Sequence, residues 1–212
     1  MLYYLKKLLI LIGMTDEKSI NGQVVVVMGP TGSGKGTLIK HILEEIPTIE
    51  HTISVTTRKP RDNEVDGREY YFWSDSKFKD KVKAGDFLEW AEFAGFKYGT
   101  LKSEIIPRLK SNKVVIMEID LQGVEQLLKL IPRNNITLVY IDAGDWETMR
   151  ARALARAPIS KSDLEKRHTR FLIESQAKSK ADYIIDNSGS LEVALMQLRS
   201  VFKSVFNKTE KR

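Results

Sequence analysis

A glycine-rich loop that follows an apolar run constrains the fold of this chain more than any other feature. The run Val24–Met28 is apolar throughout, and the loop reads Gly-Pro-Thr-Gly-Ser-Gly-Lys-Gly-Thr over residues 29–37. Glycines can adopt positive φ, so that successive backbone N–H groups turn inward onto phosphate oxygens. Apolar residues at helical spacing come next. The pattern therefore predicts a strand, a phosphate-binding turn and a helix N-terminus.

The loop residues are candidate ligands of a nucleoside triphosphate: Gly29, Pro30, Thr31, Gly32, Ser33, Gly34, Lys35, Gly36 and Thr37. We expect Lys35 to place its charge near the β- and γ-phosphates. Gly36 stands where a hydroxyl normally contacts magnesium, so no direct magnesium ligand is predicted inside the loop. The alternative, a glycine-rich turn with a solvated lysine, is disfavoured by the flanking strand and helix.

Composition indicates an ordinary soluble protein. The chain has 212 residues, of which 42% are hydrophobic and 29% charged, and no apolar run approaches the roughly 18 to 20 residues of a membrane span. The net charge of +6 fits phosphate-rich substrates as well as nucleic acid, and no RNA-binding motif is present. Without cysteine there is no disulfide, thiolate chemistry or cysteine zinc site. We expect a cytoplasmic protein that binds neither nucleic acid nor membrane.

The first residues resemble the start of a signal peptide. However, the apolar stretch after Lys7 has only five residues, and no small-residue cleavage pattern follows. A second methionine, Met14, precedes a polar segment and is an alternative start. We therefore expect residues 1–19 to be an N-terminal extension, with residues 1–13 dispensable for chemistry.

The remaining pattern predicts an α/β fold. An alternating, β-branched strand is expected at 52–57, further strands at 114–120, 136–141 and 183–185, and helices at 122–130, 146–156, 162–180 and 191–206. A helix is also expected from Thr100 to about Lys110, interrupted near Pro107. Strands that alternate with helices predict a parallel sheet covered on both faces, and the stretch 52–100 predicts a small β-rich insertion.

The segment Ser54–Arg61, with Glu64–Gly67 and Tyr70 after it, resembles the nucleoside-monophosphate site of guanylate kinases. Together with the phosphate loop and segments 87–91, 98–100 and 120–123, the resemblance covers nearly all of residues 22–206. It implies reversible transfer of the γ-phosphoryl group of ATP to GMP, with magnesium, giving ADP and GDP. It further implies a three-layer P-loop kinase fold.

The resemblance also implies an organisation of the chain. Residues 20–212 would form one domain, with a core of 20–51, 101–149 and 168–212, a GMP-binding region of 52–100 and a helical lid region of 150–167. ATP and GMP are the expected partners, and a homodimer is compatible with the sequence.

Arginines and tyrosines in the insertion suit a phosphate dianion. Arg58 and Arg61 offer two planar guanidinium groups at short spacing, and Tyr70 and Tyr98 can add hydroxyl donors.

A carboxylate and a hydroxyl suit the edge of guanine. Glu89 can accept from N1–H and N2–H₂, and Ser54 can donate to O6, whereas adenine presents a bare acceptor at N1. By resemblance, Thr100 joins this site, and Glu118 and Asp120 contact the GMP side and hydrated magnesium, Asp120 through water.

The resemblance supplies further candidates. Lys35, Arg152, Arg156 and Arg167 match catalytic cations that surround the phosphates, and Asn187 matches a position near the donor adenine. The family's Gly-Arg-Gly lid sequence is replaced by Ala155-Arg156-Ala157-Pro158.

Two alternatives stay open. One is a catalytically inactive guanylate-kinase-like module that binds phosphopeptides, although such modules typically lose the loop lysine and the lid arginines. The other is a different nucleoside-monophosphate kinase, which the Ser54 and Glu89 pair disfavours.

Overall fold

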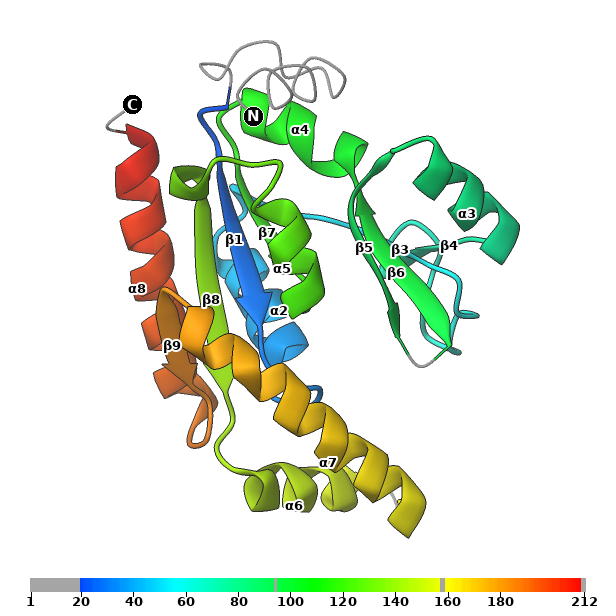
Figure 1. Cartoon of the computed structure of the whole chain (residues 1–212). Coiled ribbons are helices and arrows are strands. Elements are labelled where there is room, and N and C mark those ends of the chain that lie inside the picture. Colours follow the sequence, from blue (N-terminus) through cyan, green and yellow to red (C-terminus); the bar gives the residue numbers. More distant parts are fainter. Residues whose placement is uncertain (1–19, 94, 157–158, 211–212) are drawn as a thin grey trace.

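The computed structural model describes residues 20–93, 95–156 and 159–210, so the N-terminal extension lies outside the described residues. A five-stranded sheet in the order β2-β7-β1-β8-β9 forms its centre (Figure 1), and every pairing is parallel. The strands are β1 (Gln23–Met28), β2 (Ile49–His51), β7 (Val114–Glu118), β8 (Ile136–Asp142) and β9 (Tyr183–Asp186). Within the described ranges, no helix is long and apolar enough to cross a bilayer.

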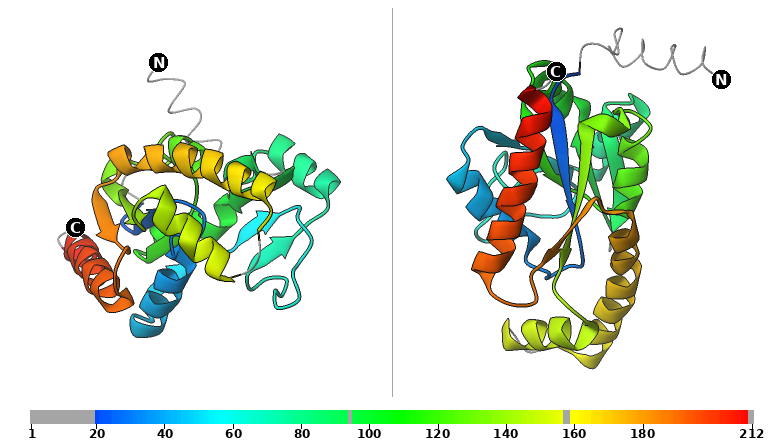
Figure 2. Two further views of the ribbon diagram at one scale, coloured as in Figure 1. Left: turned by 90° about the horizontal axis from the view of Figure 1, so that it is seen from below. Right: turned by 90° about the vertical axis from the view of Figure 1, so that its left-hand side faces the viewer.

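Helices cover both faces of this sheet. Val25 and Val27 pack with α2 (Lys35–Glu45) and α8 (Leu191–Glu210). Val24 and Val26 pack on the other face with α4 (Lys102–Lys110) and α5 (Leu121–Leu127). Figure 2 shows α8 and α2 on the side opposite α5. Because both faces are buried, the strands are apolar throughout rather than alternating. The predicted three-layer α/β fold is confirmed.

The β-rich insertion forms a second sheet beside the first (Figure 1). Its strand order is β4 (Tyr70–Phe72), β3 (Ser54–Thr56), β6 (Phe96–Leu101) and β5 (Phe87–Phe93). Helix α3 (Asp75–Lys83), capped by Ser74, packs on it through Phe78, whose ring stacks on Phe87 with centroids 4.4 Å apart. We call this sheet with α3 the second lobe.

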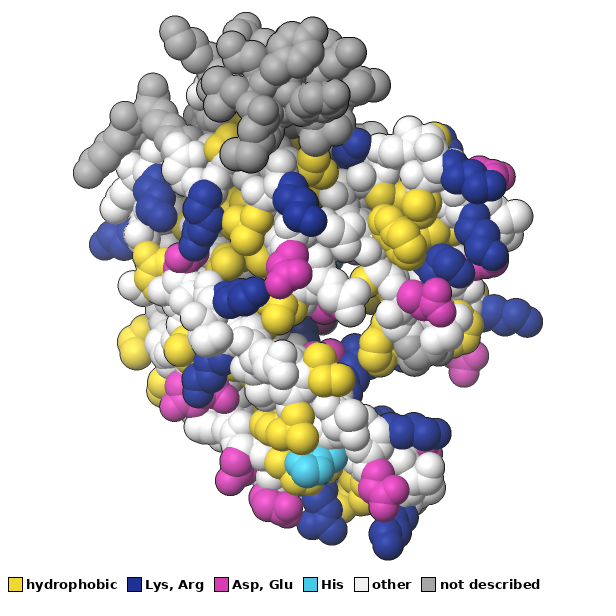
Figure 3. All heavy atoms as spheres, in the orientation of Figure 1, with side chains coloured by type: hydrophobic (Ala, Val, Ile, Leu, Met, Phe, Trp, Pro, Cys, Tyr) yellow, Lys and Arg dark blue, Asp and Glu magenta, His cyan; other side chains and the backbone are white. Residues whose placement is uncertain are grey.

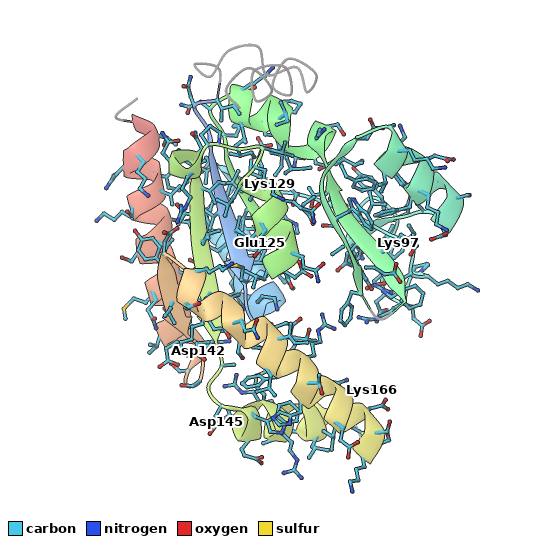
Figure 4. The ribbon with its side chains drawn as sticks, in the orientation of Figure 1. Lys97, Glu125, Lys129, Asp142, Asp145 and Lys166 are labelled. Carbon is cyan, nitrogen blue, oxygen red and sulfur yellow. The ribbon has the colours of Figure 1, made fainter. Side chains whose placement is uncertain are left out.

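Two helices extend from the core below the second lobe. Trp146 of α6 (Trp146–Arg156) stacks on His168 of α7 (Lys161–Ser175) with ring centroids 4.7 Å apart. A 3₁₀ helix, η3 (Gln176–Lys180), continues α7, and another, η2 (Arg133–Asn135), precedes β8. Asp142, at the end of β8, accepts a hydrogen bond from Lys178 at 2.6 Å, which fixes η3 to the sheet (Figure 4).

Three expected elements differ in the structure. The strand expected at 52–57 is shortened to β3 (Ser54–Thr56), and β2 (Ile49–His51), which was not predicted, precedes it, because the chain leaves the main sheet after His51 and enters the second at Ser54. The helix expected from Thr100 begins at Lys102, since β6 continues to Leu101, and it runs through Pro107. That proline removes one bond to the carbonyl of Ser103, which is exposed to solvent. The helix expected at 162–180 is α7 followed by η3.

Candidate active site

A cavity of about 470 Å³ lies between the main sheet, the second lobe and α7. Figure 3 shows the surface hollowed between the second lobe and the α6–α7 pair. Strands of an open parallel sheet present their carboxyl ends to such a crevice, where ligands of α/β proteins bind. The cavity wall includes predicted residues from distant segments: Gly29, Thr31, Lys35, Ser54, Arg58, Arg61, Tyr70, Glu89, Tyr98, Glu118 and Asp120.

The phosphate loop has the backbone that the sequence predicted. Gly29, Gly32 and Gly34 have φ of 140°, 91° and 94°. A side chain at Gly34 would overlap the amide nitrogen of Asn187, and one at Gly29 would come within 2.5 Å of the Ile141 carbonyl. Helix α2 begins at Lys35, so its N-terminus and its unpaired N–H groups face the loop. The loop is therefore shaped for an anion.

Lys35 is held at the loop. Its Nζ donates to the carbonyls of Gly29 at 2.8 Å and Pro30 at 3.1 Å, and it lies 3.5 Å from Glu118 Oε1. Its side chain is only 10% exposed. The ammonium group is thus fixed beside the turned N–H groups.

Asn187 holds the loop through its side-chain amide. Its Nδ2 donates to the carbonyl of Ser33 at 2.7 Å, and the residue is buried after β9. The predicted contact with the donor adenine stays a prediction.

One carboxylate organises the two arginines of the second lobe. Glu64 accepts from Arg58 Nη1 at 2.9 Å and Nη2 at 2.8 Å, and its Oε2 also accepts from the Arg61 backbone N–H at 2.8 Å. The Arg58 hydrogen bond holds the pKa of Glu64 below its usual range. Sequence reasoning gave Glu64 no role, although its spacing of three from Arg61 is a signal for pairing within one turn.

Aromatic rings complete this wall. The rings of Tyr70 and Tyr98 meet edge to face with centroids 6.1 Å apart, and the Arg58 guanidinium carbon lies 5.5 Å from the Tyr70 ring centre. Burial raises the pKa of Tyr70, so its hydroxyl remains a donor at neutral pH. Guanidinium and phenol groups therefore face the cavity together.

Glu89 is a buried acid. It is 5% exposed, pairs with Thr100 across β5 and β6, and packs on the first turn of α5. A Cβ at Gly123 would lie 2.8 Å from Glu89 Oε2, so the glycine lets this carboxylate lie close to the helix backbone. Burial raises the pKa of Glu89 to about 7; the charge of Asp120 adds to this, and Thr100 opposes it.

Asp120 caps α5 beside this acid. Its Oδ1 accepts from the Gly123 N–H at 2.9 Å, which fixes the orientation of the carboxylate on the cavity wall. Within the described ranges no group of three or more acidic, histidine or cysteine residues could hold a metal ion by itself. Asp120 and Glu118 line the cavity, and their predicted contacts with hydrated magnesium stay predictions.

Some predicted residues do not line the cavity; they include Thr100, Asn187 and two of the lid arginines. Arg152 Nη2 donates to the Ser188 carbonyl at 2.9 Å, and Arg167 is exposed on α7; neither lines the cavity. The side chain of Arg156 and residues 157–158 lie outside the described residues. The catalytic roles of these arginines stay predictions.

Two residues of α7 that sequence reasoning missed do line the cavity, namely Arg170 and Glu174. They follow Arg167 at helical spacing of three and seven residues, so they share one face of α7 with it. That spacing is the signal by which they could have been found.

Comparisons with known proteins point to one family. The family model described as guanylate kinase matches residues 21–205. The chain belongs to the guanylate kinase family. A guanylate kinase of Helicobacter pylori is 39% identical over 185 residues, covering 87% of this chain and 88% of the relative. One of Prochlorococcus marinus is 37% identical over 181 residues, covering 85% and 97%.

The fold of the guanylate kinase family is also found by structural comparison. A crystal structure of guanylate kinase from Anaplasma phagocytophilum matches with a TM-score of 0.71 at 24% identity, covering 88% of this chain and 86% of that chain. At that identity the likeness supports the fold alone. The resemblance read from the sequence is confirmed at the level of family and fold.

Proposed function

We propose that this protein is a guanylate kinase, which transfers the γ-phosphoryl group of ATP to GMP reversibly and gives ADP and GDP in purine nucleotide metabolism. The observation that carries the proposal is a single cavity lined both by the loop with Lys35 and by the pair Arg58 and Arg61, two sets of groups suited to phosphate. Phosphoryl transfer asks a protein mainly to hold two anionic reactants in line and to neutralise their charge.

The donor would bind by its phosphates. The turned N–H groups of the loop and of the N-terminus of α2 would donate hydrogen bonds to the phosphate oxygens, and Lys35 would add a fixed positive charge. On phosphate binding, the Lys35 ammonium would exchange the Gly29 and Pro30 carbonyls for phosphate oxygens.

The acceptor would bind by both of its ends. Arg58 and Arg61 with Tyr70 and Tyr98 would hold the phosphate of GMP, with Glu64 keeping the Arg58 guanidinium oriented.

The base would be read deeper in the cavity. Ionised Glu89 accepts from guanine N1–H and N2–H₂, Ser54 donates to O6, and Thr100, Glu118 and Asp120 complete the base side. A neutral Glu89 would lose one acceptor, so its ionisation accompanies GMP binding.

Magnesium would be shared with the substrates. Gly36 offers no hydroxyl, and Glu118 is already paired with Lys35, so Asp120, through water, is the residue that would hold the ion with the phosphate oxygens. When bound with ATP, the ion supplies positive charge that neutralises the phosphates. Arg152, Arg156 and Arg167 would add charge on closure of the lid.

The proposal includes the organisation expected from the sequence. The domain of residues 20–212 has a core, a GMP-binding region at 52–100 and a lid region at 150–167. A cytoplasmic location and a homodimer belong to the proposal as well.

A coupled assay of ADP formation with GMP, AMP, UMP and CMP tests it. Turnover with GMP well above the other acceptors is expected, and a Lys35→Ala protein prepared in parallel is the control. Turnover with another acceptor alone would make the protein a different nucleoside-monophosphate kinase. If none of these acceptors supports turnover, the remaining interpretation is the catalytically inactive module that binds phosphopeptides.

A further inference from the structure

Glu174 of α7 reaches out of its helix to the phosphate loop. Its Oε2 accepts the backbone N–H of Thr31 at 2.7 Å, and its Oε1 accepts the Thr31 hydroxyl at 3.3 Å. The carboxylate side chain is 16% exposed. A charged acceptor on a backbone N–H forms one of the stronger protein hydrogen bonds, so the start of the loop is fixed to α7.

Arg170 of the same helix reaches in the other direction. Its Nε donates to Glu174 Oε1 at 2.6 Å, and its guanidinium carbon lies 3.3 Å from the ring centre of Phe93. Phe93 ends β5, the strand that also carries Glu89, and its ring centre is 6.4 Å from that of Tyr98. Arg170 therefore contacts the second lobe beside Tyr98, one of the candidate GMP ligands.

These contacts form one continuous path, from Thr31 through Glu174 and Arg170 to Phe93. An ion pair between residues four apart can form on any helix surface, and it does not by itself imply a contact with the loop or with the second lobe. Here the pair contacts the donor loop at one end and the acceptor lobe at the other, across the cavity that both line.

We propose that Arg170 and Glu174 are positioning residues that couple the two nucleotide sites. Glu174 fixes the phosphate loop through Thr31, and Arg170 fixes the second lobe through Phe93, so the acceptor phosphate is held in line with the donor. The inference rests on the proposed function. It differs from the action of the lid arginines because it works through Thr31 and Phe93 rather than on a phosphate group.

The coupling has a measurable consequence. A bound donor nucleotide that orders the loop also favours the second lobe in its docked position, so each nucleotide should strengthen the binding of the other. Removing the aromatic ring or the planar guanidinium should reduce this mutual enhancement by the same factor for both nucleotides, because coupling between two sites is reciprocal.

The test compares four single variants with the wild type. Phe93→Leu and Arg170→Lys keep the apolar bulk or the charge but lose the stacked contact. Each should raise KM for GMP at saturating ATP, and KM for ATP at saturating GMP, by about threefold to tenfold. Phe93→Tyr keeps the ring and should rescue KM for GMP to within about twofold of the wild type. Lys166→Ala removes a cation from the same helix, at a side chain that is 76% exposed (Figure 4), and should change neither constant.

A double variant, Phe93→Leu with Arg170→Lys, tests whether the two residues act as a pair. Its KM for GMP should equal that of the worse single variant, because both changes remove one contact. Calorimetric titration of GMP, with and without a non-hydrolysable ATP analogue, should show enhancement by the analogue in the wild type and a reduced enhancement in Arg170→Lys. Thermal melting of every variant confirms that it is folded.

The outcomes separate the two proposals. Wild-type turnover with GMP, together with Phe93→Leu and Arg170→Lys values equal to wild type, would overturn the coupling alone. An equal loss of GMP affinity with and without the ATP analogue would also overturn it, since a general structural role lowers the affinity in both conditions. A wild type that does not use GMP would overturn the proposed function and the coupling with it.

Discussion

The phosphate loop and the acceptor pocket face one cavity, yet they are built from different parts of the chain. The loop is a contiguous segment that presents backbone N–H groups, and its shape depends on glycines at positive φ. The acceptor pocket is made of side chains from several strands, among them Ser54, Tyr70 and Glu89. A backbone site is specified locally, whereas a side-chain site depends on how the strands pack.

The electrostatics of the two halves differ as well. The loop carries a fixed cation, Lys35, beside neutral backbone groups. The acceptor half holds opposite charges close together, since Arg58 donates two hydrogen bonds to the Glu64 carboxylate. It also contains Glu89, whose pKa is raised by burial. Donor binding should therefore respond to backbone changes, and acceptor binding to charge and pH.

The largest effect is expected from Lys35→Ala. Removing a preorganised charge at a reacting phosphate should lower kcat by about 10²- to 10³-fold, because the interaction is strongest in the transition state. Steady-state turnover measures this, and a urea titration should show a folded protein. A fall smaller than tenfold would mean that the loop backbone, rather than its lysine, carries the charge stabilisation.

Arg58→Lys should affect the acceptor half selectively. Lysine keeps the charge but cannot form a bidentate pair of hydrogen bonds with a phosphate or with Glu64, so KM for GMP should rise by about tenfold to 100-fold. KM for ATP serves as the internal control and should stay near its wild-type value. Arg68→Lys, on the same segment but paired with Glu69, is a matched substitution outside the cavity wall. Equal effects of the two substitutions would contradict a specific role for Arg58.

Local patterns explain how much of the fold could be predicted. Apolar runs such as Val24–Met28 are buried on both faces, and that burial is visible in composition alone. The crossing of the chain from the main sheet to the second sheet, at Thr52 and Ile53, could not be predicted. β-Branched residues favour extended structure whether or not they belong to a sheet. The continuation of α4 through Pro107 could not be predicted either. The helix is stabilised there by tertiary packing, since Ile105 and Leu109 are buried on either side of the proline.

The same contrast explains the site. The loop could be predicted because spacing fixes its geometry, and Gly34 adopts the conformation that the motif requires. The pairing of Arg58 with Glu64 and the contact of Arg170 with Phe93 depend on contacts that only the folded chain creates. The hydrogen bond from Arg152 to the Ser188 carbonyl likewise depends on the fold, since a matching position in the sequence does not tell which way a side chain points.

Acceptor binding should depend on pH through Glu89. Since ionised Glu89 is the form that accepts from guanine, kcat/KM for GMP should fall about tenfold per pH unit below about 7 and level off above it. The nucleotide phosphate titrates nearby, at about pH 6, so Glu89→Gln is the control that retains only this second ionisation. Identical pH profiles for the two proteins would exclude a base-reading carboxylate.

The raised pKa of Glu89 also affects stability. Between about pH 4.5 and 7, the folded state holds a proton that the unfolded state has lost, so the wild type loses stability as pH rises through this window. Relative to Glu89→Gln, the loss should reach at most about 3 kcal/mol of unfolding free energy. Urea denaturation at pH 5 and pH 8 measures it. A difference between the two proteins that does not change with pH would mean that Glu89 is not buried as an acid.

The smallest effects come from two neighbouring glycines and test the donor half directly. Gly34→Ala should destabilise the fold by about 1–3 kcal/mol and raise KM for ATP, because φ is 94° and the added methyl group overlaps Asn187. Gly36→Ala is the matched control: a Cβ there meets no atom within 4 Å, and it lies in the first turn of α2. It should stabilise the ligand-free protein by up to about 1 kcal/mol. Urea denaturation without nucleotide compares them, and equal stabilities would show that the donor site does not depend on its left-handed backbone.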